Sequence, residues 1–321
     1  MSSYGPLKIL ACRAAENFGG QIGIELDEQL LQKDFGEYDN DNTRVCLEDD
    51  VRGSDVFVIQ QMAPPVNHNL AELLFAVGLL KQESAARITA VVPYYPYARS
   101  DWCDEGERTL ITAAFVADML HQAGAHRILT MDPHSRSIRG FVIQSKMNFD
   151  ALSATKMLRE QVKDTSGNSL VLVAPDAGSA KYISKHAEAM STPYAIIDKR
   201  RTGHEGKTEA VNIVGDVEGS DVLMLDDETL TGGTFISASQ LLKERGAERI
   251  FAACTHAFLN EAAVKKIEDS KLDSLFITNT IPLVEQITSE KITVITVAEM
   301  FAKAIRRIHE DKSIKQMGSK H

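Results

Sequence analysis

Short apolar runs rich in β-branched residues alternate with segments of helical periodicity along most of this chain. In the first half, the apolar runs are residues 56–60, 88–93 and 128–132. Between them, residues 69–81 and 111–123 carry apolar side chains at helical spacing, and the second of these segments stops at Gly124, a residue type that commonly ends helices. Nearly continuous apolar strands joined by helices are typical of parallel sheets covered on both faces, so the sequence predicts an α/β fold.

The second half continues the same alternation, with apolar runs at residues 170–174, 194–197, 222–225, 250–254, 274–278 and 292–296. Two short motifs recur between the halves. Leu79-Leu80-Lys81 returns as Leu241-Leu242-Lys243, and Arg87-Ile88 returns as Arg249-Ile250. Because the repeats fall at the same place in the strand–helix–strand order, they favour two related domains.

We place these domains at residues 1–150 and 151–321, with a helix over 151–162 opening the second. The helical pattern over 299–310 is a candidate to pack back on the first domain. The formal net charge of −10 argues against a broad duplex-DNA-binding face. Four scattered cysteines and no long apolar stretch indicate a soluble, cytoplasmic protein with reduced thiols.

The stretch LDDETLTGGT, residues 225–234, lies between an apolar run and a helical pattern that begins near Phe235. Ligands of α/β folds bind where a parallel strand ends and a helix begins. Gly232 and Gly233 allow the backbone N–H groups to approach an anion, and the helix N-terminus favours negative charge. Asp226 and Asp227 cannot bind phosphate, but they can accept hydrogen bonds from sugar hydroxyls. The stretch therefore predicts a ribose-phosphate pocket, with an ordinary acidic turn as the alternative.

LDDETLTGGT is similar to the ribose-phosphate loop of type I phosphoribosyltransferases, and further motifs narrow the resemblance. They are PYYPYARSDW (93–102), TMDPHSRSIRGF (130–141), VAPDAGSAKY (173–182), IIDKRR (196–201), NIVGDVEG (212–219), KERGAERIFAACTHAFL (243–259), ITNTIP (277–282) and AIRRIH (304–309). Appearing in this order, they resemble the ribose-phosphate diphosphokinase family, also called phosphoribosyl diphosphate synthetases.

The resemblance implies two tandem type I phosphoribosyltransferase-like domains. It also implies transfer of the diphosphoryl group of MgATP to the 1-hydroxyl of ribose 5-phosphate, giving AMP. Catalysis of that reaction depends on positioning and cationic stabilisation more than on a covalent nucleophile. Mg²⁺ is the implied cofactor, and a homo-oligomer built from dimers, up to a hexamer, is the implied assembly.

The resemblance also assigns residue roles. The ATP-binding residues are Arg99, Asp101, His134 and Tyr38; the magnesium residues are His134 and Asp176; the catalytic residues, on a mobile lid, are Lys199 and Arg201. The ribose 5-phosphate residues are Asp226, Asp227, Thr231, Gly232, Gly233 and Thr234. From residue type alone, His134 could equally be structural, Arg99 and Asp101 a surface ion pair, and the basic cluster at 199–201 a solvated face.

Several positions depart from the family pattern. Leu230 stands where an acid is common, and Gly232 where alanine or cysteine is common. Ser100 replaces a glutamine, Trp102 a basic residue and Asn42 an adenine-reading acid. These departures leave two alternatives open beside an active diphosphokinase. One is a catalytically weak regulatory or scaffold homologue, and the other is a phosphoribosyltransferase that consumes phosphoribosyl diphosphate.

Overall fold

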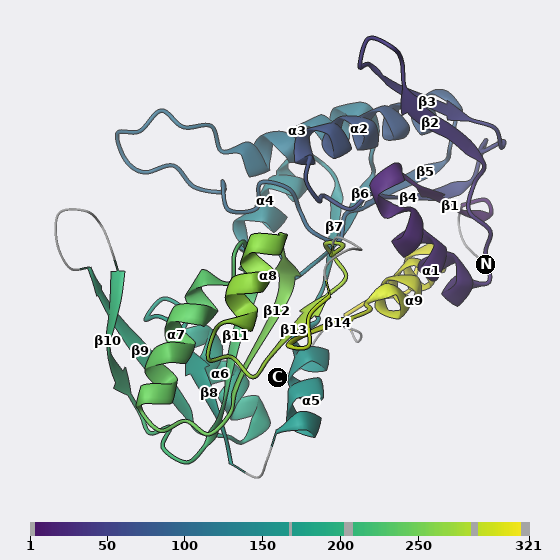
Figure 1. The fold of residues 1–321 in the computed structure, drawn as a ribbon. Coiled ribbons are helices and arrows are strands. Elements are labelled where there is room, and N and C mark those ends of the chain that lie inside the picture. Colours follow the sequence, from purple (N-terminus) through teal and green to yellow (C-terminus); the bar gives the residue numbers. More distant parts are fainter. Residues whose placement is uncertain (1–3, 167–168, 202–207, 284–287, 316–321) are drawn as a thin grey trace. The chain divides into compact units, whose positions relative to one another are not determined.

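Figure 1 shows the computed structural model, which describes residues 4–166, 169–201, 208–283 and 288–315, with the side chains of 199–201 and 208–211 excluded. The chain forms two compact units. Unit 1 contains the residues up to Ser153, residues 280–282 and the segment from Thr296; unit 2 contains residues 154–279 and 283–295. The change of unit after Ser153 lies close to the division expected at residue 150, while the segment from Thr296 belongs to unit 1.

Unit 1 is built on a five-stranded sheet of order β1-β4-β5-β6-β7, in which all neighbours are parallel. Its elements are β1 (Leu7–Ala11), η1 (Arg13–Ala15), α1 (Glu16–Leu26), the separate antiparallel hairpin β2 (Lys33–Glu37) and β3 (Thr43–Leu47), β4 (Asp55–Ile59), α2 (Val66–Gln82), β5 (Arg87–Val91), α3 (Thr112–Ala123), β6 (Arg127–Met131), α4 (Ser137–Gln144), β7 (Asn148–Leu152) and α9 (Ala298–His309).

Unit 2 is built on a seven-stranded sheet of order β10-β9-β8-β11-β12-β13-β14, parallel except for the β9–β10 hairpin. Its elements are α5 (Thr155–Thr165), β8 (Leu170–Ala174), α6 (Ala180–Met190), β9 (Tyr194–Arg201), β10 (Thr208–Val214), β11 (Asp221–Thr229), α7 (Gly233–Glu244), β12 (Ile250–Ala257), α8 (Glu261–Glu268), β13 (Ser274–Thr278) and β14 (Ile292–Ile295).

Burial explains why the central strands form. Every residue of β4, β5 and β12 is buried, as expected for strands covered by helices on both faces. In unit 1, α2 and α3 lie on one side of the sheet and α1 and α9 on the other (Figure 1). Phe301 of α9 packs edge-to-face on Phe18 of α1, with ring centroids 5.5 Å apart. The prediction of an α/β fold with parallel sheets flanked by helices is confirmed.

The two units share an order of elements and one ion pair between neighbouring strands. In each, a strand and a helix precede a hairpin, and strand–helix alternation follows. Arg87 at the start of β5 forms two hydrogen bonds to Asp55 of β4, at 2.8 and 2.6 Å. At the corresponding place in unit 2, Arg249 binds Asp221 in the same way, at 3.1 and 2.6 Å. The Arg-Ile repeat in the sequence therefore marks a repeated structural feature.

Three sequence expectations about local structure are wrong. Residues 151–162 do not form one helix, because β7 continues to Leu152 and α5 begins at Thr155. β11 does not end at Leu225: it continues to Thr229, where its pairing with β12 persists beyond the end of β8. α7 begins at Gly233, two residues before the expected Phe235.

Candidate active site

The strand order of unit 2 reverses at β8, and the predicted ribose-phosphate residues lie at that reversal. From β8 the chain passes through α6 to β9 on one side of β8, and later β11 pairs with the other side. Helices leaving the two strands in opposite directions open a crevice at the carboxyl ends of the strands, which is where α/β folds bind ligands. Asp176 follows β8, and Asp226 and Asp227 lie near the end of β11.

Asp226 and Asp227 are strand residues that project beyond the end of β8. Both are half-buried, and the Asp227 backbone N–H donates to Asp226 Oδ1 at 2.9 Å. The pKa of Asp226 is raised from 3.8 to about 7, first by burial, then by the side-chain hydrogen bond and charge of Asp227, with a contribution from Asp176. Burial, followed by the charges of Asp226 and Asp227, also raises the pKa of the Cys254 thiol on β12. The crevice is therefore strongly acidic.

The connection from β11 to α7 is short, and hydrogen bonds between its own residues stabilise it. Thr229 Oγ1 accepts a hydrogen bond from the Gly232 N–H at 3.0 Å, and Thr231 Oγ1 lies 3.4 Å from the Gly233 N. Gly232 adopts φ 70°, a left-handed conformation that favours glycine. A Cβ there would also lie 3.1 Å from the side chain of Ile267. The turn thus exposes Thr231, Gly233 and Thr234 at the N-terminus of α7, a place suited to an anion.

Asp176 belongs to a second connection at the same sheet edge, between β8 and α6. Its Oδ1 accepts from the Ser179 N–H at 2.9 Å, and the Ser179 hydroxyl donates to the Asp176 carbonyl at 2.9 Å. Ala177 and Gly178 between them are exposed. The carboxylate is therefore fixed in place beside a backbone turn that is open to solvent.

In unit 1, three of the predicted ATP residues lie at one edge of the sheet. Arg99 and Asp101 belong to the connection from β5 to α3, and His134 to the connection from β6 to α4. Since β5 and β6 are parallel neighbours, both connections leave the same edge. Arg99 and His134 are exposed, and Asp101 is half-buried.

Tyr38 lies at the tip of the β2–β3 hairpin. Its backbone N–H donates to the Asn42 carbonyl at 2.9 Å, and the guanidinium carbon of Arg44 lies 6.0 Å from the centre of its ring. Lys199 and Arg201 lie on β9, opposite Ala210 and Thr208 of β10, rather than in a loop. Their side chains, and residues 202–207 of the expected lid, lie outside the described residues.

Two residues that hold the candidate site in place escaped the sequence prediction. Thr229 is buried and holds the Gly232 turn, and Ser179 holds Asp176. The signal for Thr229 was present, because a hydroxyl three residues before a glycine at a strand–helix turn can accept its N–H. In the turn after β8, Asp176 plays the part of that hydroxyl, because its carboxylate accepts the N–H of Ser179 three residues later.

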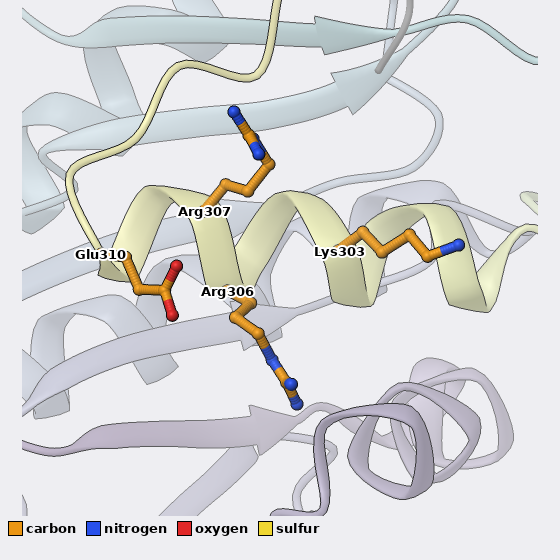
Figure 2. A pocket seen from close by; sticks show the side chains of 4 residues that line it. All are labelled: Lys303, Arg306, Arg307 and Glu310. Carbon is orange, nitrogen blue, oxygen red and sulfur yellow. The ribbon is translucent and has the colours of Figure 1, made fainter. Parts of the chain in front are cut away.

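A pocket on α9 is separate from the predicted site residues. Lys303, Arg306, Arg307 and Glu310 line it, and Figure 2 shows Arg306 and Arg307 leaving opposite sides of the helix. Arg306 donates to the Leu26 carbonyl of α1 at 2.8 Å, and Arg307 to the Ser313 carbonyl at 2.7 Å. These cations therefore fix the C-terminal segment in unit 1 rather than converge on a ligand.

Among the described residues, no group of three or more His, Cys, Asp and Glu side chains is arranged to hold a metal ion. No helix in the described parts of the chain is long and apolar enough to cross a membrane.

Known proteins are similar to this chain in sequence and in fold. Residues 7–124 match the N-terminal domain of ribose phosphate pyrophosphokinase, and residues 202–318 match the phosphoribosyl synthetase-associated domain. A ribose-phosphate pyrophosphokinase of Caldanaerobacter subterraneus is 39% identical over 97% of both chains. That of Vibrio cholerae is 38% identical over 97% of this chain and 98% of its own.

The fold agrees with the sequence comparison. The crystal structure of phosphoribosylpyrophosphate synthetase from Mycobacterium smegmatis has a TM-score of 0.88 at 33% identity, covering 96% of this chain and 100% of that one. Sequence and fold similarity both extend over nearly the whole chain. This chain belongs to the ribose-phosphate pyrophosphokinase family.

Proposed function

We propose that this protein transfers the diphosphoryl group of MgATP to the 1-hydroxyl of ribose 5-phosphate, giving 5-phosphoribosyl 1-diphosphate and AMP. The relatives named above carry the name of this activity over nearly the full length of the chain. The observation that carries the proposal is the crevice of unit 2, where two adjacent carboxylates precede a glycine turn at a helix N-terminus.

The sugar phosphate fits that crevice in one orientation. Exposed Thr231, Gly233 and Thr234 supply hydroxyl and N–H donors for the 5-phosphate at the start of α7. Asp226 and Asp227 would accept hydrogen bonds from the ribose hydroxyls, which orients the 1-hydroxyl for attack. Phosphate placed on the aspartates instead would bring like charges together in an environment that already raises the pKa of Asp226.

The nucleotide and the positive charge would come from other segments. Arg99, Asp101 and His134, at one sheet edge of unit 1, are proposed to bind ATP together with Tyr38 of the hairpin. Lys199 and Arg201 are proposed as the catalytic cations that stabilise charge on the transferred phosphoryl groups and on departing AMP.

The acidic crevice also fits Mg²⁺. Carboxylate oxygens are ligands that Mg²⁺ accepts, and the ion commonly takes only one or two of them, with substrate phosphates and waters completing its shell. Asp176 would hold the ion through its carboxylate, and His134 would face the MgATP phosphates. Mg²⁺ would supply neutralisation of charge on the phosphoryl oxygens. A shell with so few protein ligands is compatible with the lack of a three-residue metal cluster among the described residues.

We further propose a homo-oligomeric active form, which light scattering at assay concentration tests.

The test is an assay with Mg²⁺, ATP and ribose 5-phosphate that measures AMP and phosphoribosyl diphosphate together. We expect equal amounts of both products, with the signal lost in Lys199→Ala. Asp227→Ala should chiefly weaken ribose 5-phosphate binding measured by calorimetry, whereas Asp216→Ala, an exposed control in the same unit, should leave it unchanged. Absence of AMP release above the Lys199→Ala background would refute the proposal.

A further inference from the structure

The turn that carries Arg99 is tied to two helices by the residues around it. Residues 96–99 form the turn, and Arg99 projects to solvent while its neighbours are anchored. Tyr95 is 1% exposed and its hydroxyl donates to the Ala113 carbonyl in the first turn of α3 at 2.8 Å. The Tyr97 hydroxyl donates to Asn67 Oδ1 in the first turn of α2. The turn that carries Arg99 is therefore anchored to the first turns of α3 and α2.

Ser100 connects this turn to the loop that follows. Its backbone carbonyl accepts from the Ala113 N–H at 3.1 Å, and its N–H donates to the Tyr97 carbonyl at 2.8 Å. Its hydroxyl lies 3.3 Å from both the Leu110 carbonyl and Thr112 Oγ1. Thr112 Oγ1 is itself 3.3 Å from the Leu110 carbonyl.

These contacts close loop 101–111 at its base. The backbone bond to Ala113 and the hydroxyl contact with Thr112 tie Ser100 to the start of α3, and the same hydroxyl reaches the returning limb at Leu110. Inside the loop, the Glu107 N–H donates to the Asp104 carbonyl at 3.0 Å and the Cys103 thiol lies 3.5 Å from the Glu107 carbonyl. These contacts organise the tip of the loop, whereas Ser100, together with Thr112, holds its base.

We propose that Ser100 is a positioning residue for nucleotide binding. Its hydroxyl closes the base of loop 101–111 and so fixes Arg99 on one side of the closure and Asp101 on the other. The inference rests on the proposed function, because it assigns those two residues to ATP. Fixing a loop in its binding conformation before the ligand arrives lowers the ordering cost of binding. Loss of the closure should therefore weaken ATP binding and leave ribose 5-phosphate, bound by unit 2, unaffected.

Kinetics provide the first measurement, with Ser100→Ala as the variant. One neutral hydrogen bond is worth about a fivefold change in affinity, so the KM for ATP should rise about fivefold. The KM for ribose 5-phosphate should not change, and kcat should change by less than about twofold because the chemistry does not involve this hydroxyl. Ser100→Thr keeps the hydroxyl and should restore the KM for ATP.

The matched control is Ser166→Ala. The Ser166 hydroxyl donates to the Lys163 carbonyl at 3.2 Å, also near the surface, but in unit 2 at the end of α5. A general loss of stability would affect both alanine variants alike, whereas positioning of the ATP residues predicts an effect in Ser100→Ala alone.

Trp102 supplies a second measurement that does not require activity. It is the single tryptophan of the chain, it is 74% exposed, and it lies two residues from Ser100 in the loop. Opening the base of the loop should lower the fluorescence anisotropy of Trp102 in the free protein, and Ser100→Thr should restore it. Ser166→Ala should leave the anisotropy unchanged.

The outcomes separate this inference from the proposed function. Unchanged anisotropy in Ser100→Ala, or a KM for ATP equal to that of the wild type while Arg99→Ala raises it, would overturn the positioning role. A wild-type protein that releases no AMP would refute the proposed function, and the anisotropy would still report whether Ser100 closes the loop.

Discussion

The raised pKa of Asp226 predicts a measurable dependence of stability on pH. In the folded protein this carboxyl titrates at about 7 instead of 3.8, so between these values the folded state binds more protons than the unfolded state. Stability must therefore fall as the pH rises through this window. A shift of about three units corresponds to about 4 kcal/mol. Partial solvent access and screening by salt reduce the measurable part to about 2 kcal/mol.

Asp226→Asn should remove this dependence, because the amide resembles the protonated carboxyl in shape and can still donate a hydrogen bond to Asp227. The difference in melting temperature between the variant and the wild type should increase by about 4–8 °C in favour of the variant when the pH is raised from 5 to 8. This range follows from about 2–4 °C per kcal/mol for a unit of this size. Asp164→Asn, an exposed aspartate on α5, provides the same charge change without burial. An equal difference between wild type and Asp226→Asn at both pH values would refute the reasoning.

Thermal unfolding of the wild type in the presence of Mg²⁺ tests whether the crevice binds a cation. A divalent ion near Asp176, Asp226 and Asp227 stabilises their ionised forms and lowers the pKa of Asp226. Mg²⁺ without nucleotide should therefore raise the melting temperature of the wild type more at pH 8 than at pH 5. The increment at pH 8 should be smaller in Asp176→Asn, and equal increments in both proteins would argue against this carboxylate as a ligand.

Three further predictions concern stability and the sugar-phosphate turn. Burial and the charges of Arg159 and Lys185 lower the pKa of His186 from 6.5 to about 4, so stability is lost as the pH falls from 6.5 towards 4. His186→Gln should remove about 1–2 kcal/mol of that loss, measured by thermal unfolding between pH 7 and 4.5. Gly232→Ala should cost about 1–2 kcal/mol because of its left-handed φ, and calorimetry should show weaker ribose 5-phosphate binding. Arg87→Ala should cost about 3–5 kcal/mol in chemical denaturation, since buried Asp55 loses both guanidinium hydrogen bonds and keeps the contact with His309, whereas Arg249→Ala, at a side chain 41% exposed, should cost about 1 kcal/mol.

The sequence predicted best where burial determines the structure. The fully buried strands β4 and β5 were found within one or two residues of their ends, because continuous apolar runs identify them. The sequence predicted the ends of a strand less well where pairing with a neighbouring strand, rather than burial, lengthens it. β9 continues through the charged residues 198–201 because β10 pairs with it, and no apolar pattern marks that extension.

The local structure around the candidate site residues was predicted in part. Thr231, Gly232 and Gly233 lie in or beside the short turn that the glycines indicated, at the N-terminus of α7. Asp226 and Asp227 lie on the strand instead, because β12 is longer than β8 and continues to pair with β11 past the β8 end. The acids therefore project from a rigid strand, which no count of residues between motifs could reveal.

The repeated fold explains why the sugar phosphate is assigned to unit 2. The two units share the Asp–Arg pair between corresponding strands, but the connections that follow those strands differ. After β4, the connection to α2 ends in Pro64 and Pro65, which have no N–H to offer an anion. After β11, the corresponding connection ends in Gly232 and exposes the N-terminus of α7.

The neighbouring space in unit 1 is also occupied by its own ion pairs. Beside β1 and β4, the Arg13 backbone N–H and guanidinium both bind Glu72, whose side chain is fully buried, and Arg13 also pairs with Glu37. A carboxylate of the chain thus lies where a phosphate would have to compete with it, and like charges disfavour that exchange. The internal ion pairs and the prolines of unit 1 therefore disfavour a phosphate there, which supports the proposal that ribose 5-phosphate binds in the crevice of unit 2.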